Sequence, residues 1–453
     1  MKPPAEVIDE LEEGSRVRLG AVLGGVLVLA LIGGLVWLAS DVPATAEKAA
    51  PPPQAARLRN MWTPLPAASA VAAEVASPSA SAPVVVPPGY LDVCGIGLVK
   101  ESEWMGQASV EARAAAMGAT RRRAVAALKA RGDDVSRAAA LALEAQGGDV
   151  ELDMPIGCEG AGCPETPVRM ESPQSRKRRY AALGATRDQL VQLALGTRDA
   201  EVYALAYGVC EMQGREDVNS SCQMLSAERW ASLDPGNGVP WLAVAERAKA
   251  RGDRAAIAEA LHRVGLATSM DGRVGGLSRR LIELSPTPPS LETFELASQT
   301  FFLQLPGLAG YSVLASECSV AAVRDPNRLQ QCAAFAETLW SRGTTLLEWN
   351  MALAIGARTG WSLERQQATR DERDAIGRAA ATLLESEQSL SCDSIRRHTG
   401  HLVRVGQVGE IASMRERLRA SGRSIADWAR EGREVREALV RSADAAPSVP
   451  LVR

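Results

Sequence analysis

The stretch YALAYGVCEMQGREDVNSSCQMLSAERW, residues 203–230, has a form that returns once along the chain. It reads Tyr-x6-Cys, then a polar loop, then Cys-x7-Trp, and residues 311–340 have the same form. Apolar residues at helical spacing on both sides of a polar loop predict two antiparallel helices in each copy, with one cysteine on each side of the loop. The copies start 108 residues apart. This distance leaves room for three helical hairpins of about 36 residues, a length typical of helical repeat proteins.

The residues after the first copy resemble a tetratricopeptide-type repeat. In that family a proline ends the preceding repeat, an aromatic residue opens the first helix, and a Gly-Asp turn leads into the second helix. The matching residues are Asp234, Pro235, Gly236, Asn237, Trp241, Val244, Ala245, Gly252, Asp253, Ile257, Leu261 and Val264. The chain departs from the family where Ile257 replaces a small alanine and Ser269 replaces the closing proline. The resemblance covers residues 234–268 and implies an all-α domain of stacked hairpins, a TPR-like α-solenoid with a concave binding surface.

The composition agrees with a helical protein. Only 4% of the 453 residues are aromatic, while alanine, leucine and arginine are common. This balance favours packing of helix on helix over a β-sandwich or barrel. The formal net charge of −3 provides no strong positive field, so we expect no nucleic-acid partner.

The amino-terminal region predicts a membrane anchor and a linker. Residues 19–40 carry no charge and are long enough to cross a hydrocarbon core of about 30 Å as one helix. Residues 1–18 are then a cytoplasmic tail, because Arg16 and Arg18 lie against the membrane on that side. Residues 41–89 contain ten of the 25 prolines, which predicts a disordered, extended Pro/Ala-rich linker.

A cleaved signal peptide is the alternative to this anchor. The stretch Ala44-Thr45-Ala46 resembles a cleavage site, but a signal peptide normally has an apolar region of only about 7–15 residues. We therefore expect a single-pass protein of the inner (cytoplasmic) membrane, with the membrane as one partner and the bulk of the chain periplasmic. Gly20 and Gly24 form a small-xxx-small pair that permits a dimer of membrane helices, although glycine is also simply common in such helices.

Helical patterns fill the chain from residue 90 to residue 442. A proline-rich stretch, Ser285–Pro289, predicts a hinge between two helical subdomains, residues 90–285 and 286–442. Glycines and prolines between residues 149 and 172 predict a surface loop. We expect residues 443–453 to form a disordered tail.

The cysteine content indicates an oxidising compartment. All eight cysteines follow residue 90, and their number is even, which is typical of a disulfide framework in an exported domain. Local spacing predicts three pairs, and elimination leaves a fourth. These pairs are Cys158–Cys163, Cys210–Cys222, Cys318–Cys332 and Cys94–Cys392. On a chain-entropy estimate, each bridge across a loop of the two repeated segments stabilises the fold by about 3 kcal/mol.

The sequence contains no recognisable catalytic, cofactor or metal motif. His398 and His401 form an HxxH pair without the glutamate of a zinc-protease motif, so we expect a loop or helix-end pair and no metal. Glu101-Ser102 resembles the Glu-Ser start of lytic transglycosylases, but the Gly-Leu-Met-Gln stretch of that family is absent. A diverged cell-wall hydrolase, or lytic transglycosylase-like enzyme, is therefore the alternative function.

The favoured function is a binding or scaffold protein with an unknown envelope protein as its partner. The candidate contact face lies on the first helix of the TPR-like hairpin, whose charged residues we expect to be unnecessary for the core. Its residues are Glu246, Arg247, Lys249 and Arg251. Four tryptophans at hairpin positions are expected to wedge neighbouring helices in the core rather than to bind a ligand. These are Trp230, Trp241, Trp340 and Trp349.

Overall fold

The computed structural model describes residues 86–104, 106–147, 152–155, 169–212, 221–286, 289–301, 308–386 and 390–445. The predicted cytoplasmic tail, the transmembrane segment, most of the linker, residues 446–453, and both Cys158 and Cys163 lie outside these ranges. Among the described residues, no helix combines the length and the apolar character needed to cross a bilayer.

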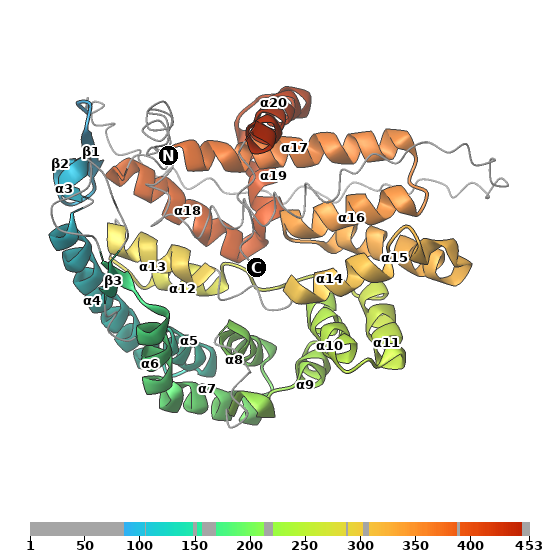
Figure 1. Cartoon of the computed structure of the whole chain (residues 1–453), viewed down its shortest axis with the longest axis horizontal. Helices are drawn as coiled ribbons and strands as arrows, with labels where there is room; N and C mark the ends of the chain where they lie inside the picture. Colours follow the sequence, from blue (N-terminus) through green and yellow to red (C-terminus); the bar gives the residue numbers. More distant parts are fainter. Residues whose placement is uncertain are drawn as a thin grey trace, which may run out of the picture.

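The described chain is built mainly from α-helices, which confirms the all-α prediction (Figure 1). The first group comprises α3 (Glu101–Trp104), α4 (Gln107–Arg131), α5 (Asp134–Ala145), α6 (Pro173–Ala182), α7 (Gly184–Gly196), α8 (Ala200–Met212) and α9 (Ala227–Leu233). Two hairpins follow, α10 (Gly238–Ala250) with α11 (Arg254–Gly265), and α12 (Gly276–Glu283) with α13 (Leu291–Phe301). The last group comprises α14 (Leu308–Glu317), α15 (Pro326–Arg342), α16 (Leu346–Arg358), α17 (Leu363–Ser386), α18 (Cys392–Val408), α19 (Glu410–Ala420) and α20 (Ile425–Ala445).

Two short β-hairpins interrupt the helices, and neither is predicted by the sequence analysis. Strand β1 (Tyr90–Val93) pairs antiparallel with β2 (Gly97–Lys100), and β3 (Leu152–Pro155) pairs with β4 (Arg169–Glu171). In the first hairpin Val93 is fully buried, and Leu91 and Val99 pack against the same apolar cluster. A two-residue period over four residues is too short to stand out beside the longer helical patterns.

Residues 238–265 form the predicted pair of helices, α10 and α11, joined by a short turn. Gly252 adopts a left-handed conformation with φ of 71°, which glycine tolerates without a steric penalty. Asp253 then caps α11, because its side chain accepts a hydrogen bond from the backbone N–H of Ala256. Ile257 is buried although it is larger than the usual alanine. The segment that follows α11 returns to the start of α10, because the N–H of Gly238 donates to the carbonyl of Ser269.

The second cysteine segment differs from the predicted antiparallel pair. Its first helix, α14, packs mainly on α10, whereas α15 packs along α16 and also contacts α11. Phe335 explains part of this placement, because its ring lies against Gly265 at the end of α11. The hydroxyl of Thr338 donates to the carbonyl of the same glycine at 3.2 Å. In the first copy α8 does contact α9, but α8 packs mainly on α5 and α7, and α9 packs mainly on α10.

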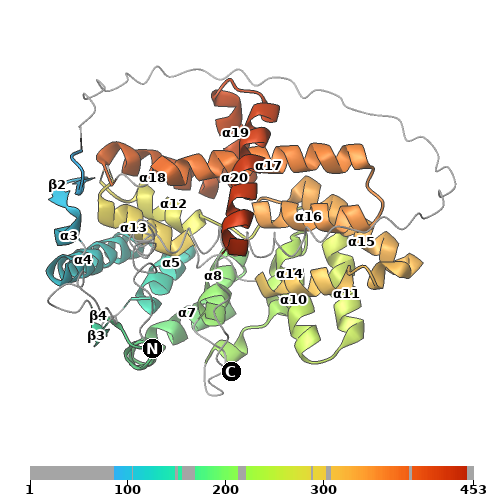
Figure 2. The same cartoon turned by 45° about the horizontal axis from the view of Figure 1, so that its top comes forward.

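The helix contacts form a closed path rather than ending at the last helix. Beginning at α4, the path runs through α5, α8, α9, α10, α14, α16, α17, α19, α18 and α13, and α13 packs back on α4 (Figure 1). The hairpin α12–α13 spans the predicted hinge and lies against α18. Figure 2 shows the last helix, α20, crossing α17. The first helices of the described chain are therefore linked through α13 to α18, which lies in the last third.

Candidate functional site

The predicted contact face lies in a seam between helices. Helix α10 is flanked by α9, α11 and α14. Lys249 donates to the hydroxyl of Ser316 in α14 at 3.3 Å, and Arg251 pairs with Glu228 in α9 at 3.4 Å. Glu246 is half-buried. The four predicted residues therefore do not form one surface free of contacts within the chain.

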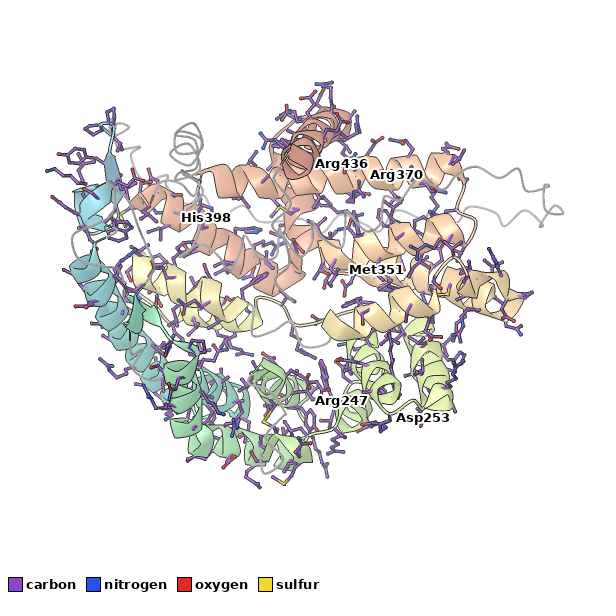
Figure 3. The ribbon with its side chains drawn as sticks, viewed as in Figure 1. Arg247, Asp253, Met351, Arg370, His398 and Arg436 are labelled. Atoms are coloured by element: carbon purple, nitrogen blue, oxygen red, sulfur yellow. A yellow bond between two sulfur atoms is a disulfide. The ribbon has the colours of Figure 1, made fainter. Side chains whose placement is uncertain are left out.

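Arg247 departs most from the prediction. Its guanidinium forms an ion pair with Glu211 in α8, and in Figure 3 it lies where α8 faces α10. Burial lowers the pKa of Arg247, but hydrogen bonding and charge attraction from Tyr207 and Glu211 outweigh burial and raise it overall. Arg247 therefore links two helices that are separated in sequence by a loop and α9, and it does not lie on a face free of contacts.

The starts of several helices meet in what we call the central hub, formed by residues 234–238, 268–275, 343–348 and 409–411. A helix start has backbone N–H groups without partners inside the helix, and the hub supplies partners from other segments. The N–H of Ile411 donates to the carbonyl of Thr344 at 3.0 Å, and the hydroxyl of Thr344 donates to the carbonyl of Met270 at 3.1 Å. In Figure 1 the hub lies near the middle of the molecule, where ends of α12, α16, α18 and α19 meet.

Asn237 joins two segments of the hub. Its side-chain oxygen accepts from the N–H groups of Val239 and Asp271, at 3.1 and 3.0 Å. Its side-chain nitrogen donates to the carbonyl of Asp271 and to the carboxylate of Asp234. Asn237 is only 1% exposed, so this residue of the repeat-like motif is a fixed structural link.

An ionic network attaches the hub to α8. Arg273 has a φ of 55° and is the only non-glycine residue with a positive φ in the described ranges. Such a conformation costs about 1–3 kcal/mol and persists where its surroundings enforce it. Arg273 donates from its backbone to Asp271 at 2.7 Å, and its guanidinium pairs with Asp234 at 3.4 Å. Glu201 of α8 pairs with Arg280 at 3.0 Å and lies 4.0 Å from Arg273.

Glu348 is the most deeply buried carboxylate of the hub. It is 1% exposed, and burial raises its pKa to about 7 although hydrogen bonds from Tyr311, Thr345 and Thr344 lower it. One carboxylate oxygen accepts from the hydroxyl of Tyr311 at 2.7 Å. The other accepts from the backbone N–H groups of Thr344 and Thr345, at 2.6 and 2.9 Å. Both oxygens are thus occupied, and Glu348 serves as the capping-box residue of α16.

Glu410 occupies a related position at the start of α19. Its carboxylate accepts from the N–H of Leu346 in the first turn of α16, at 2.9 Å. Burial raises the pKa of Glu410, and the Leu346 hydrogen bond lowers it. By solvent-accessible area Glu410 is half-buried. The two carboxylates therefore accept hydrogen bonds from the backbone N–H groups at the start of α16. This structural role accounts for their burial, so no catalytic role is needed to explain it.

The remaining residues that the sequence suggested for chemistry, His398, His401 and Glu101, lie within helices. His398 and His401 lie inside α18, not in a loop or at a helix end. The ring nitrogens of His398 lie 2.7 and 3.0 Å from the carbonyl oxygens of Ser394 and Leu383. No cluster of three or more potential metal ligands occurs within the described ranges. Glu101 is exposed on the single-turn helix α3.

The four tryptophans belong to the core, as predicted. Trp230 and Trp349 are each 1% exposed, while Trp241 and Trp340 are partly buried against core clusters. The rings of Trp340 and Trp349 lie 4.0 Å apart between centroids and join α15 to α16. The sequence did not single out Trp361, whose ring packs edge-on to Trp340 at 6.3 Å.

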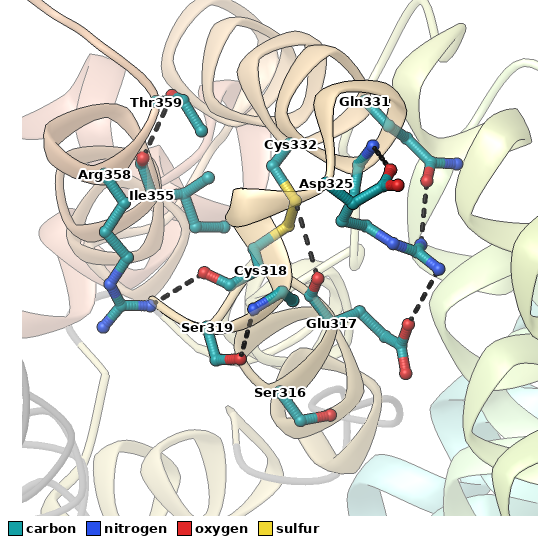
Figure 4. The surroundings of a disulfide bond; sticks show 12 residues. Ser316, Glu317, Cys318, Ser319, Asp325, Gln331, Cys332, Ile355, Arg358 and Thr359 are labelled. Carbon is teal, nitrogen blue, oxygen red and sulfur yellow. Dashed lines mark hydrogen bonds and ion pairs between the residues drawn. A yellow bond between two sulfur atoms is a disulfide. The ribbon is translucent and has the colours of Figure 1, made fainter.

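Three of the predicted disulfides are present. They are Cys94–Cys392, Cys210–Cys222 and Cys318–Cys332. Figure 4 shows the last of these, where Arg358 of α16 donates to the carbonyl of Cys318 at 3.1 Å. Arg328 pairs with Glu317 across the same loop at 3.1 Å. The Cys318–Cys332 disulfide fixes the end of α14 to α15, even though the two helices pack mainly on other neighbours.

Comparison with known proteins adds no relative. No protein-family model, no curated protein and no solved structure matches the chain.

Proposed function

We propose that the chain is a single-pass, membrane-anchored, disulfide-stabilised helical-repeat protein that acts as a binding or scaffold module of the bacterial cell envelope. The observation that carries this proposal is the use of Glu348 within the fold. A catalytic carboxylate must reach a substrate, whereas this one is buried with both oxygens bonded to its own chain. A buried carboxylate whose pKa is raised to about 7 is therefore a structural cap in this fold.

The anchor and the compartment belong to the same proposal. We propose that residues 19–40 form the membrane helix, and the disulfide bonds of the folded region support an oxidising location beyond the membrane. We propose a tetratricopeptide-like repeat for residues 234–268, which contain α10 and α11, the two helices of one packed hairpin. Gly20 and Gly24 would allow two anchors to pair. The linker would hold the folded region at high effective concentration near other envelope proteins.

Crosslinking in cells, followed by pulldown and mass spectrometry, tests the partner. Lys249 and Arg251 are the residues to reverse, because both are exposed and their contacts lie at the surface. The double variant Lys249→Glu/Arg251→Glu should keep the helical circular-dichroism spectrum and lose most of the crosslinked partner. Arg247 is unsuitable for this purpose because its ion pair joins α8 to α10.

Arg263→Glu is the matched control. Arg263 lies on α11 of the same hairpin, and its exposed guanidinium pairs with Glu259 one helical turn away. This variant should retain the partner if the contact face is on α10. Equal loss in both variants would place the contact elsewhere. Degradation of cell wall by the purified protein, abolished by one carboxylate substitution, would replace the binding proposal with the hydrolase alternative.

A further inference from the structure

The three described disulfides differ in their access to solvent. Cys210, Cys222, Cys318 and Cys332 are each at most 1% exposed. Cys94 is half-buried and Cys392 is exposed. Thiol–disulfide exchange requires an incoming thiolate to reach a sulfur atom of the bond. Cys94–Cys392 is therefore the described bond that a reductant can approach in the folded protein.

This bond joins parts of the chain that are 298 residues apart. It connects the β1–β2 hairpin, where the linker enters the folded region, to the start of α18. Besides the disulfide, the N–H of Cys94 donates to the carbonyl of Leu390 at 2.8 Å. A small apolar cluster supports the contact. Its buried members are Val93, Trp104, Leu291, Phe294 and Ile395.

The main core does not depend on this junction. The cluster at the junction is separate from the two larger clusters, which extend from α4 to α16 and from α16 to α20. The two buried disulfides lie in the largest of these clusters. Opening Cys94–Cys392 therefore removes a link between the amino-terminal hairpin and the rest of the fold, while the larger clusters and their disulfides keep their contacts.

We propose that Cys94–Cys392 is an exchange site for an envelope dithiol reductant, and that its reduction releases the β1–β2 hairpin from α13 and α18. A thiolate of the dithiol attacks the sulfur of Cys392 and forms a mixed disulfide, and the sulfur of Cys94 leaves as a thiolate that takes up a proton. The second thiol of the reductant then attacks its own mixed-disulfide sulfur and releases Cys392. The bond gains two electrons and two protons, and the dithiol becomes a disulfide.

The consequence concerns the attachment of the folded region. In the oxidised protein the linker emerges from a hairpin that is held on α18 by a covalent bond. In the reduced protein the same linker emerges from a hairpin that is held without a covalent bond, by the small apolar cluster and the Cys94–Leu390 hydrogen bond. Release lengthens the tether by the hairpin and exposes Val93, Trp104, Leu291 and Phe294. This inference rests on the proposed anchor and envelope location, but it does not require the proposed partner binding.

Differential alkylation tests the exchange on the full chain in detergent. The protein is treated with increasing dithiothreitol under native conditions, trapped with one alkylating reagent, unfolded, fully reduced and labelled with a second. Peptide mass spectrometry then reads each cysteine separately. Cys94 and Cys392 should be trapped at least about tenfold faster than the four buried cysteines, because the thiolate reaches only their bond. Equal rates for all described bonds, or earlier trapping of Cys210 or Cys318, would overturn the proposal.

Hydrogen exchange tests the release. After mild reduction, residues 90–104 and the facing parts of α13 and α18 should lose protection, while α10, α11 and α15 keep theirs. The double variant Cys94→Ser/Cys392→Ser, made without any reductant, should show the same pattern. Unchanged protection of residues 90–104 in both samples would show that the bond does not hold the hairpin. Loss of protection throughout the protein would show unfolding instead of local release.

Discussion

Single residues of the central hub give the fold a dependence on pH. The pKa of Glu348 is raised from its ordinary value of 4.5 to about 7, mainly by burial. The folded protein therefore binds this proton more tightly than the unfolded chain does. Between pH 4.5 and 7 the contribution of Glu348 to the free energy of unfolding falls as the pH rises. Burial also raises the pKa of Glu295 to about 7 and that of Glu410, so these groups act in the same direction.

The variant Glu348→Gln isolates this contribution. Glutamine has nearly the same shape and stays neutral at every pH, so the part of the pH dependence due to Glu348 should disappear. Urea unfolding of both proteins at pH 5, 6, 7 and 8 measures it. Relative to the variant, the wild type should lose roughly 2–3 kcal/mol across this range, because its pKa is raised from 4.5 to about 7 in the folded protein. A difference that stays constant, or grows in favour of the wild type, would contradict the buried assignment of this carboxylate.

The charged residues of α10 should divide into structural and surface groups. Arg247→Glu places a negative charge beside Glu211 in a half-buried position, so we expect a loss of about 1–3 kcal/mol in the free energy of unfolding. Arg251→Glu affects an exposed pair with Glu228, and such pairs contribute about 0–1 kcal/mol. Chemical denaturation compares the two variants. Equal stability would mean that the Arg247–Glu211 contact adds nothing to the packing of α8 on α10.

The roles of single residues are predictable from sequence where they depend on residue type and local spacing. The tryptophans had to be buried, and the paired cysteines lay across short loops. Sequence reasoning could not find the partner of Tyr311, which is Glu348 on another helix. It also treated Arg247 as a surface charge, because the position of Glu211 depends on how α8 and α10 meet. Such contacts are fixed by tertiary packing and not by the local sequence.

At the scale of elements, the crossing of α17 and α20 depends on one small residue. Gly432 of α20 faces α17 so closely that an added Cβ would overlap the carbonyl oxygen of Asp374. Ion pairs flank the approach, with Arg433 to Asp371 at 2.5 Å and Arg436 to Asp374 at 3.5 Å. Gly432→Ala should lower the free energy of unfolding by about 1–3 kcal/mol, the usual cost of overpacking.

Gly377→Ala is the control for this substitution. Gly377 lies within α17, and an added Cβ would meet no atom within 4 Å. Alanine favours a helix over glycine by roughly 0.5–1 kcal/mol, so this variant should gain stability. Urea unfolding of both variants gives the comparison. A loss in Gly377→Ala, or a gain in Gly432→Ala, would show that α20 does not pack on α17 in this way.

Elements were predictable where their information is local. The turn between α10 and α11 needs a glycine followed by a capping aspartate, and both are visible in the sequence as Gly252 and Asp253. The pairing of α15 was not predictable from the repeated cysteine pattern. A disulfide fixes only the ends of a loop. The apolar face of α15 packs instead on α16 and α11.

For the whole molecule, the closed path of helices was beyond sequence reasoning, because it depends on contacts between distant segments. The pairing of α13 with α4, and of α12 with α18, has no local signature. The Cys94–Cys392 bond was reached by elimination, and it lies at the seam where the first and last thirds of the described chain meet. Local patterns predict hairpins such as α10 with α11, whose helices are neighbours both in space and in sequence.

The predicted anchor would decide on which side of the membrane the folded region, with its Cys94–Cys392 bond, is placed. Residues 19–40 are uncharged and long enough to span the membrane, and Arg16 and Arg18 favour a cytoplasmic amino terminus. A reporter enzyme that is active only after export, fused after Gly89, should therefore be active and remain in the membrane fraction. The same fusion lacking residues 19–40 should be inactive, which controls for export by another route. Mature protein that begins at Glu47 would show a cleaved signal peptide and contradict the anchor, while the disulfides would still indicate an exported domain.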